Sequence, residues 1–111
     1  MDQPIYLSLV IPFYNVGEHF KPLLQSLEQQ LIAGVEAVLV CDGANDGSLA
    51  LAQQHIAASA VTKRYQLITQ ANAGVSAARN QGIAHARGQY ISFVDADDIL
   101  LDGYSETILT A

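Results

Sequence analysis

The chain has little of several residue types on which small domains often depend. Its 111 residues include one cysteine and no tryptophan. A single thiol, Cys41, excludes an intramolecular disulfide and is typical of a reducing compartment. No run approaches the roughly 18 apolar residues of a membrane-spanning helix, and no basic segment leads into an apolar stretch at the N-terminus. We therefore expect a cytoplasmic chain with no membrane segment.

Basic residues are also scarce, with 5 lysines and arginines against 11 acidic residues and a net charge of −6. This balance argues against nucleic acid or an anionic membrane surface as the main partner. An anionic small molecule would have to bind through a metal ion or through local backbone amides. Half of the residues are apolar, which is enough for a buried core, and the length predicts one domain covering residues 1–111.

Strand-like and helix-like segments alternate along the chain. Short apolar runs rich in β-forming residues predict strands at 6–11, 35–40, 65–69 and 90–94. Capping residues or helical spacing predict helices after Asn15, after Asp46 or Ser48, after Gly74 and over 102–109. Strands this apolar cannot face water, so we expect an α/β, Rossmann-like, mostly parallel sheet with helices on both faces.

The first helix carries a proline whose effect depends on where the helix begins. Asn15 can cap it, with Glu18 three positions later as in a capping box. Pro22 costs little if the regular helix starts near Glu18, because the proline then falls in the first turn. The apolar face at helical spacing comprises Phe20, Leu23, Leu24, Leu27 and Leu31.

Residues that often belong to binding sites follow three of the predicted strands directly, and ligands of parallel sheets bind at these strand ends. Those that follow the first two strands are Pro12, Tyr14, Asn15, Asp42, Gly43, Asn45 and Asp46. Each alone has an ordinary structural role, since proline ends strands, asparagine caps helices and Asp-Gly forms turns. Their joint placement at one edge of a sheet favours a binding site.

The fourth predicted strand, at 90–94, ends in three carboxylates within four residues, Asp95, Asp97 and Asp98. We expect the strand to be buried, which would put a dense anionic cluster at the rim of the core. Like charges this close repel each other, and a divalent cation with oxygen ligands would remove the conflict. An isolated cluster of this kind is more often a solvated acidic turn, but its position behind an apolar strand favours a metal site.

The segment from Asn72 to Asn80 adds groups suited to phosphate. Gly74 and Ser76 can form the N-terminus of a helix, and Arg79 supplies a guanidinium. Arginine in a helix is more often a surface residue. Arg79 is, however, one of only five cationic side chains, so its place in this motif is informative.

Four ordered segments together resemble the N-terminal, nucleotide-binding half of the inverting family 2 glycosyltransferases of the GT-A fold. They are Leu9 to Asn15, Val40 to Ser48, Asn72 to Asn80 and Tyr90 to Asp98. The resemblance implies transfer of a sugar from a nucleoside-diphosphate donor, with Mg²⁺ or Mn²⁺ bridging the diphosphate. A role in polysaccharide biosynthesis is one of several that it allows, and sugar, acceptor and linkage stay open.

The resemblance also implies roles for individual residues. Pro12 and Tyr14 would line the nucleobase pocket, with the Tyr14 ring offering an aromatic face. Asp42 would accept a hydrogen bond from the base, which suits the imide N–H of uracil. Arg79 would steady the diphosphate or the acidic cluster.

In the acidic cluster, the resemblance implies that Asp95 and Asp97 form the Asp-x-Asp metal motif. Asp95 would lie near the ribose or a metal-bound water and so contribute to nucleotide binding, while Asp97 would bind the metal directly. Asp98 would not bind the metal directly and would support the other two aspartates.

The chain departs from the family pattern after the second strand. Family members usually have two adjacent acids there and a Ser-Thr pair in the turn, whereas this chain has Cys41-Asp42 and Ala44-Asn45. The missing acid weakens the case for uridine, although a UDP-sugar remains the favoured donor. We interpret Cys41 as a buried strand residue, and the three histidines, on separate predicted helices, as surface or boundary residues.

The chain offers no candidate for the general base that an inverting transfer needs. Family members carry that aspartate in a C-terminal half, so we expect a truncated domain that holds the donor and metal site only. A sheet ending at its fourth strand should expose an apolar edge, and we expect self-association.

Other classes of protein fit less well. Receiver domains place an acid pair after their first strand, and dinucleotide-binding domains need a G-x-G-x-x-G there, but Pro12 to Asn15 is neither. The alternative that stays open is a non-catalytic nucleotide-binding or interaction domain derived from a glycosyltransferase.

Overall fold

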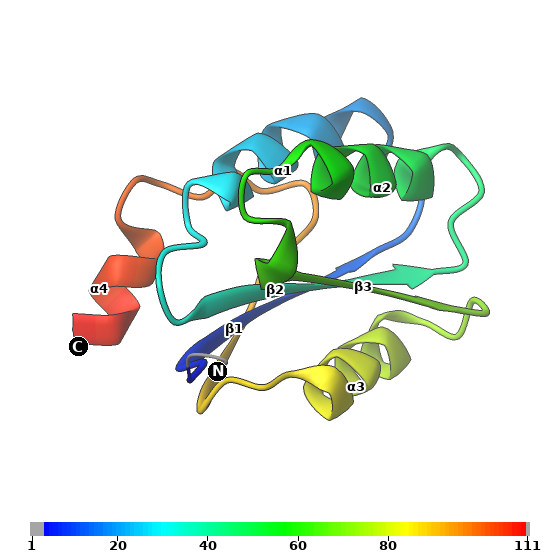
Figure 1. Cartoon of the computed structure of the whole chain (residues 1–111). Helices are drawn as coiled ribbons and strands as arrows, with labels where there is room; N and C mark the ends of the chain where they lie inside the picture. The colour runs from blue at the N-terminus through cyan, green and yellow to red at the C-terminus, as the bar shows by residue number, and fades with distance from the viewer. Residues whose placement is uncertain (1–3, 111) are drawn as a thin grey trace.

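The computed structural model describes residues 4–110, and its centre is a parallel four-stranded sheet (Figure 1). The strands are β1 (Leu7–Phe13), β2 (Val35–Asp42), β3 (Tyr65–Gln70) and β4 (Tyr90–Phe93), in the order β3-β2-β1-β4. The helices are α1 (Phe20–Glu28), α2 (Ser48–Ala58), α3 (Val75–His85) and α4 (Tyr104–Thr110), with short 3-10 turns η1 (Gly17–His19) and η2 (Thr62–Arg64). The predicted alternation of strands and helices is confirmed.

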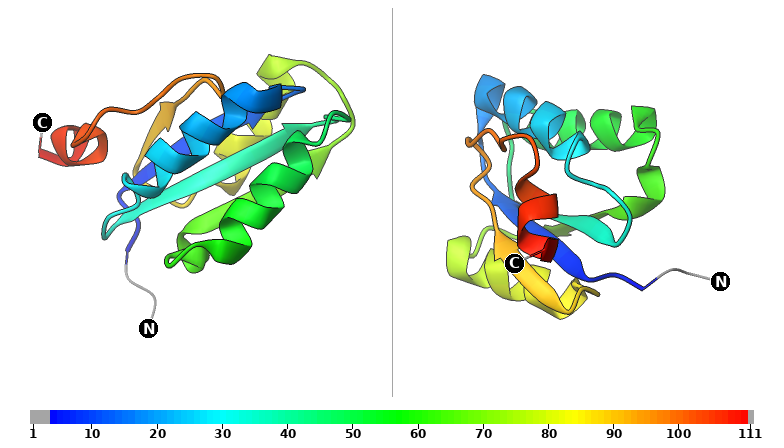
Figure 2. Two further views of the ribbon diagram at one scale, coloured as in Figure 1. Left: turned by 90° about the horizontal axis from the view of Figure 1, so that it is seen from above. Right: turned by 90° about the vertical axis from the view of Figure 1, so that its left-hand side faces the viewer.

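Helices cover both faces of the sheet, as predicted. Helices α1 and α2 lie on one face and α3 lies on the other, while α4 packs beside one end (Figures 1 and 2). Leu9 and Ile11 of β1 belong to the core cluster under α1 and α2, and Val10 between them belongs to the cluster under α3. Both faces of β1 are buried, which is why its sequence is apolar at every position except Ser8. Cys41 is buried on β2, as its interpretation required.

Helix α3 packs unusually close to the sheet at Gly82. A Cβ built on Gly82 would lie 2.3 Å from Cγ1 of Val10. The absence of a side chain there lets the helix backbone approach the central strand. This close packing holds the C-terminal half of α3 against β1. The N-terminal end of the same helix borders the candidate site.

The first helix begins later than its capping signal suggested. The turn η1 precedes it, α1 starts at Phe20, and Pro22 falls in its first turn, where a missing N–H costs little. The prediction that Asn15 caps this helix is wrong. Asn15 adopts a φ of +46°, and its side chain bonds to Asn45 instead. The helix ends at Glu28, and Leu31 is buried beyond it.

The expectation that the fourth strand is buried is also wrong. Among residues 4–110, strand β4 pairs only with β1 and is the edge of the sheet, with Tyr90 66% and Phe93 45% exposed. Burial begins after the strand, where Val94, Ala96 and Leu100 enter the core. Composition predicted an apolar contact for the whole run, but the strand order places only its end against the core.

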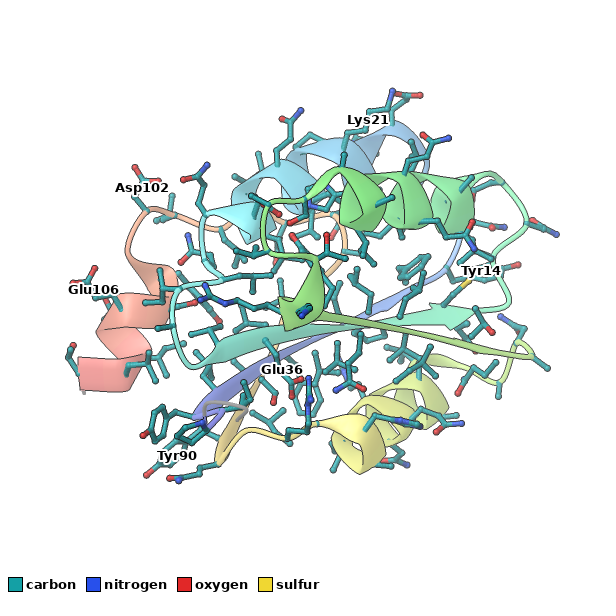
Figure 3. The ribbon with its side chains drawn as sticks, in the orientation of Figure 1. Tyr14, Lys21, Glu36, Tyr90, Asp102 and Glu106 are labelled. Carbon is teal, nitrogen blue, oxygen red and sulfur yellow. The ribbon has the colours of Figure 1, made fainter. Side chains whose placement is uncertain are left out.

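A buried carboxylate in β2 ties three segments together. Glu36 is fully buried and accepts hydrogen bonds from the Ser8 hydroxyl at 2.6 Å, the Arg87 backbone N–H at 2.6 Å and Gln66 Nε2 at 2.9 Å. Figure 3 shows Glu36 between the sheet and the segment that follows α3. Burial alone would raise the pKa of Glu36, but these hydrogen bonds outweigh it and hold the pKa below its usual value.

Replacing this carboxylate should destabilise the fold in a pH-dependent way. We expect Glu36→Gln to lower the free energy of unfolding at pH 7 by about 2–4 kcal/mol, because its donors lose a charged acceptor. The folded pKa lies below the unfolded one, so the stabilisation is present above about pH 4.5 and is lost as the pH falls through the folded value. Denaturant unfolding at pH 7 and pH 3 measures both effects.

The matched control is Glu106→Gln, which changes an exposed carboxylate on α4. Wild type and this control should lose more stability than Glu36→Gln between the two pH values. Equal losses in all three proteins would show that Glu36 does not contribute as inferred.

Candidate nucleotide and metal site

At the carboxyl ends of the strands, where we predicted a site, the structure has two adjoining hollows. Both are lined by Pro12, Phe13 and Tyr14 at the end of β1. The first, of about 270 Å³, also contacts Asp42 and the start of α3. The second, of about 370 Å³, is completed by Asn15, Val16, His19, Asp95, Ala96 and Asp97. Of the six residues predicted to bind the nucleotide or the metal, five line these hollows and Arg79 lines neither.

A larger hollow of about 840 Å³ lies elsewhere, at the opposite ends of β1 and β4. Its wall comprises Tyr6, Leu7, Ala33, Tyr90, Ile91, Ser92, Ile108 and Leu109. This wall includes no carboxylate, histidine or basic side chain, so we do not assign the predicted chemistry to it. Figure 3 shows Tyr14 and Tyr90 at opposite ends of the molecule.

Hydrogen bonding explains why the second hollow opens beside Pro12. Strand β4 pairs with β1 only as far as Val10, whose carbonyl accepts from Val94 N–H at 3.0 Å. The backbone groups of Pro12, two residues further along β1, face the same side of the strand as those of Val10, but β4 has already turned away there. A proline at position 12 therefore removes no ladder hydrogen bond. β1 and β4 separate at this point. The order β3-β2-β1-β4 changes direction between these two strands, and ligands of parallel sheets usually bind at such a place.

Asp42 has a structural role that the amino-acid sequence of the chain did not reveal. The residue is 4% exposed, and its carboxylate accepts from Gln70 Nε2 at 2.9 Å and from the backbone N–H groups of Ala73 and Gly74 at 2.8 and 3.0 Å. Burial would raise the pKa of Asp42, but these donors lower it overall. Asp42 thereby holds the loop before α3 against the first hollow. Its predicted hydrogen bond to a base stays a prediction.

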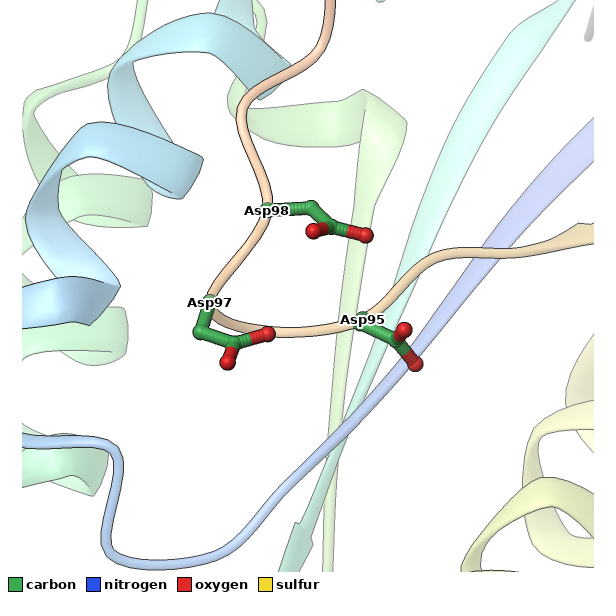
Figure 4. Close-up of side chains that lie close together, drawn as sticks. All are labelled: Asp95, Asp97 and Asp98. Carbon is green, nitrogen blue, oxygen red and sulfur yellow. The ribbon is translucent and has the colours of Figure 1, made fainter.

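The three aspartates after β4 form an exposed cluster (Figure 4). One carboxylate oxygen from each of Asp95, Asp97 and Asp98 lies within 4.8 Å of the others. Val94 and Ala96 are buried, so the backbone that carries the acids is anchored while their side chains face solvent. Three oxygen donors this close match the preference of Mg²⁺ and Mn²⁺. Asp95 and Asp97 also line the second hollow, whereas Asp98 does not.

Arg79 lies apart from the two hollows. Its Cζ is 5.6 Å from the centroid of the Phe93 ring, which places the guanidinium over an edge-strand aromatic. Its Nε is buried and has no hydrogen-bond partner among residues 4–110. An unsatisfied buried donor is costly, and the predicted contact of Arg79 with the diphosphate stays a prediction.

Comparison with known proteins identifies the family. Residues 8–111 match the model of "Glycosyl transferase family 2". The chain belongs to that family. The uncharacterized glycosyltransferase YibD of Escherichia coli is 39% identical over 110 residues, which are 99% of this chain and 31% of that protein. The chain spans about a third of the curated relatives it matches.

Solved structures of glycosyltransferases confirm the predicted GT-A type of fold. Residues 1–349 of Staphylococcus aureus TarS in complex with UDP-GlcNAc superpose with a TM-score of 0.84 at 24% identity, over 96% of this chain and 30% of those TarS residues. The mannosyltransferase PcManGT from Pyrobaculum calidifontis, in complex with GDP-Man and Mn²⁺, gives 0.81 at 20% identity, over 96% and 31%. Within residues 4–110, no helix is long and apolar enough to cross a membrane.

Gly43 is a residue on which this site should depend. It follows Asp42 with a φ of +75°, and a Cβ there would lie 2.7 Å from the Asn72 backbone nitrogen. We expect Gly43→Ala to displace the loop that Asp42 holds and to lower the free energy of unfolding by about 2–4 kcal/mol. Gly103→Ala is the control, because its φ is +79° and nothing lies within 4 Å.

The difference between the two variants isolates the steric contact from the cost of positive φ. Thermal unfolding should rank Gly43→Ala well below Gly103→Ala. Similar melting temperatures would contradict the close approach of the two loops.

Proposed function

We propose that this chain binds the nucleoside-diphosphate sugar donor of an inverting glycosyltransferase. The observation that carries the proposal is the pair of hollows that share Pro12, Phe13 and Tyr14, with an acidic cluster at one side. The base would lie in the first hollow against the Tyr14 ring, and the diphosphate would extend toward Asp95 and Asp97. The two solved relatives are complexes with a UDP-sugar and a GDP-sugar, which supports this class of donor.

Asp95 and Asp97 would hold Mg²⁺ or Mn²⁺ in the second hollow. The metal would supply positive charge to the diphosphate leaving group during transfer. Asp98, outside that hollow, would support the pair through the turn in which its N–H donates to the Asp95 carbonyl at 3.1 Å. Arg79 would approach the same phosphates from the side of α3.

We favour UDP as the nucleotide, because Asp42 lines the first hollow and uracil offers an N–H to a carboxylate acceptor. Asp42 already accepts several hydrogen bonds, so a base would share one of its oxygens with the loop before α3. The free, buried thiol of Cys41 agrees with a cytoplasmic location, which we also propose.

Catalysis requires a general base that these residues do not supply. Among the described residues, the carboxylates that line the two hollows are Asp42, Asp95 and Asp97, and each has another role. We propose that another part of the protein carries the base and that residues 1–111 form one donor-binding domain. If this chain instead binds no sugar nucleotide, it is an interaction domain derived from the family. Metal-dependent release of UDP from UDP-GlcNAc would support the transferase, and no binding of the sugar nucleotide at all would support the interaction domain.

Removing the direct metal ligand should abolish metal-dependent binding. We expect wild type to bind UDP more tightly with Mn²⁺ than without, and Asp97→Ala to lose that difference while keeping the weak metal-free binding. Calorimetry with and without Mn²⁺ measures both. Asp102→Ala, an exposed acid outside the cluster, should behave as wild type. Equal affinity of wild type with and without metal would overturn the metal assignment.

We propose that the chain self-associates through β4. The outer side of this strand has no pairing partner in the sheet of residues 4–110, and Tyr90, Ile91 and Phe93 are all exposed on it. The strand carries no charge or proline to block edge pairing. A second copy could continue the sheet and cover these side chains.

Light scattering at micromolar concentration should therefore detect a dimer or larger species. Ile91→Lys should shift it toward the monomer by placing a charge on the edge. Ala57→Lys is the control, because Ala57 is an exposed apolar residue of α2, which packs against β3 at the other edge of the sheet. A wild-type chain that stays monomeric would refute the proposal.

A further inference from the structure

Two loops at the carboxyl edge are joined by a set of hydrogen bonds that no sequence motif indicates. We call the contact between the loop after β1 and the loop after β2 the clasp, formed by residues 15–17 and 45–48. Val16 N–H donates to Ser48 Oγ at 3.1 Å, and Gly17 N–H donates to Asp46 Oδ2 at 3.0 Å. Hydrogen bonds from the hydroxyl and N–H of Ser48 lower the pKa of Asp46, which keeps it an anionic acceptor.

The centre of the clasp is a reciprocal pair of asparagines. Asn15 Nδ2 donates to Asn45 Oδ1 at 3.0 Å, and Asn45 backbone N–H donates to Asn15 Oδ1 at 2.8 Å. Asn15 also has a φ of +46°, and no other described non-glycine residue has a positive φ. The pair therefore stabilises a backbone conformation that residues other than glycine, asparagine and aspartate seldom adopt.

This turn determines where Tyr14 lies. Phe13 is 3% exposed and anchored in the core, whereas Tyr14 is 49% exposed, so packing alone does not fix its ring. The backbone on its other side begins with Asn15, which the clasp holds. Tyr14 is part of the wall that both hollows share, so a shift of this turn changes both.

We propose that Asn45 is a positioning residue for nucleotide binding, acting through Asn15 on Tyr14. Asn45 lines neither hollow, so it has no direct contact with a nucleotide bound there. Its amide oxygen accepts a hydrogen bond from the Asn15 side chain. This inference rests on the proposed function, because the ligand that it affects is the donor nucleotide.

The test compares substitutions that remove or restore single bonds of the pair. Asn45→Ala removes the acceptor of Asn15 Nδ2, and Asn45→Asp restores it. Asn15→Gly removes both side-chain bonds but keeps a residue that tolerates positive φ. Gln54→Ala, the loss of an exposed amide on α2, is the control. The probes are UDP with Mn²⁺ by calorimetry, well below the melting temperature, and amide hydrogen exchange of Val16 and Gly17.

We expect Asn45→Ala to weaken UDP binding by about 3- to 10-fold, as one lost hydrogen bond would, and Asn15→Gly to weaken it further. Val16 and Gly17 should exchange faster in both variants, and Asn45→Asp should return binding to within about 2-fold of wild type. A purely structural role would lower the melting temperature and leave the affinity unchanged, which would overturn the inference. Unchanged exchange at Val16 and Gly17 would refute the clasp itself. Failure of wild type to bind UDP would instead overturn the proposed function.

Discussion

The candidate site depends on the point at which β1 loses its pairing with β4. As far as Val10, β1 is hydrogen-bonded on both sides and buried on both faces. Beyond it, the β2 ladder continues to Phe13 while β4 has ended. The unpaired side of β1 then faces the segment that carries the aspartates. A crevice results without any special loop, because β1 extends further than its parallel neighbour β4. The strand order of the sheet changes direction between these two strands, which is where ligands of such sheets bind.

Most of the fold could be predicted from the sequence because the constraint on a doubly covered strand is strong. Every residue of β2 is buried, and a strand covered on both faces must be apolar along nearly its whole length. The same reasoning failed for β4, whose composition is similar but whose place is at the edge. Apolar composition predicts contact with some partner. It does not say whether that partner lies within the sheet or beyond its edge.

The site residues were predicted as types and places, but not their internal contacts. Pro12, Tyr14, Asp95 and Asp97 line the hollows because strand ends converge, and that follows from topology alone. The bonds of Asn15 to Asn45 join residues 30 positions apart, and local sequence favoured helix capping as the role of Asn15. Glu36 gave no signal at all, because a charged residue in an apolar strand is interpretable only once its donors are known.

The carboxylates of the chain divide by whether the protein itself supplies their hydrogen-bond donors. Glu36 and Asp42 are buried and accept from several internal N–H and O–H groups, which hold their pKa values down and stabilise the anions. The carboxylates of Asp95 and Asp97 are instead exposed and closely spaced, and they stay open to solvent. Buried anions without internal donors would be costly, whereas exposed ones lose little by remaining free to take a cation. Aspartate thus has two roles on the two sides of Tyr14. Asp42 holds a loop in place because the protein supplies hydrogen-bond donors to its carboxylate, whereas Asp95 and Asp97 lie exposed and can offer oxygen ligands to a cation.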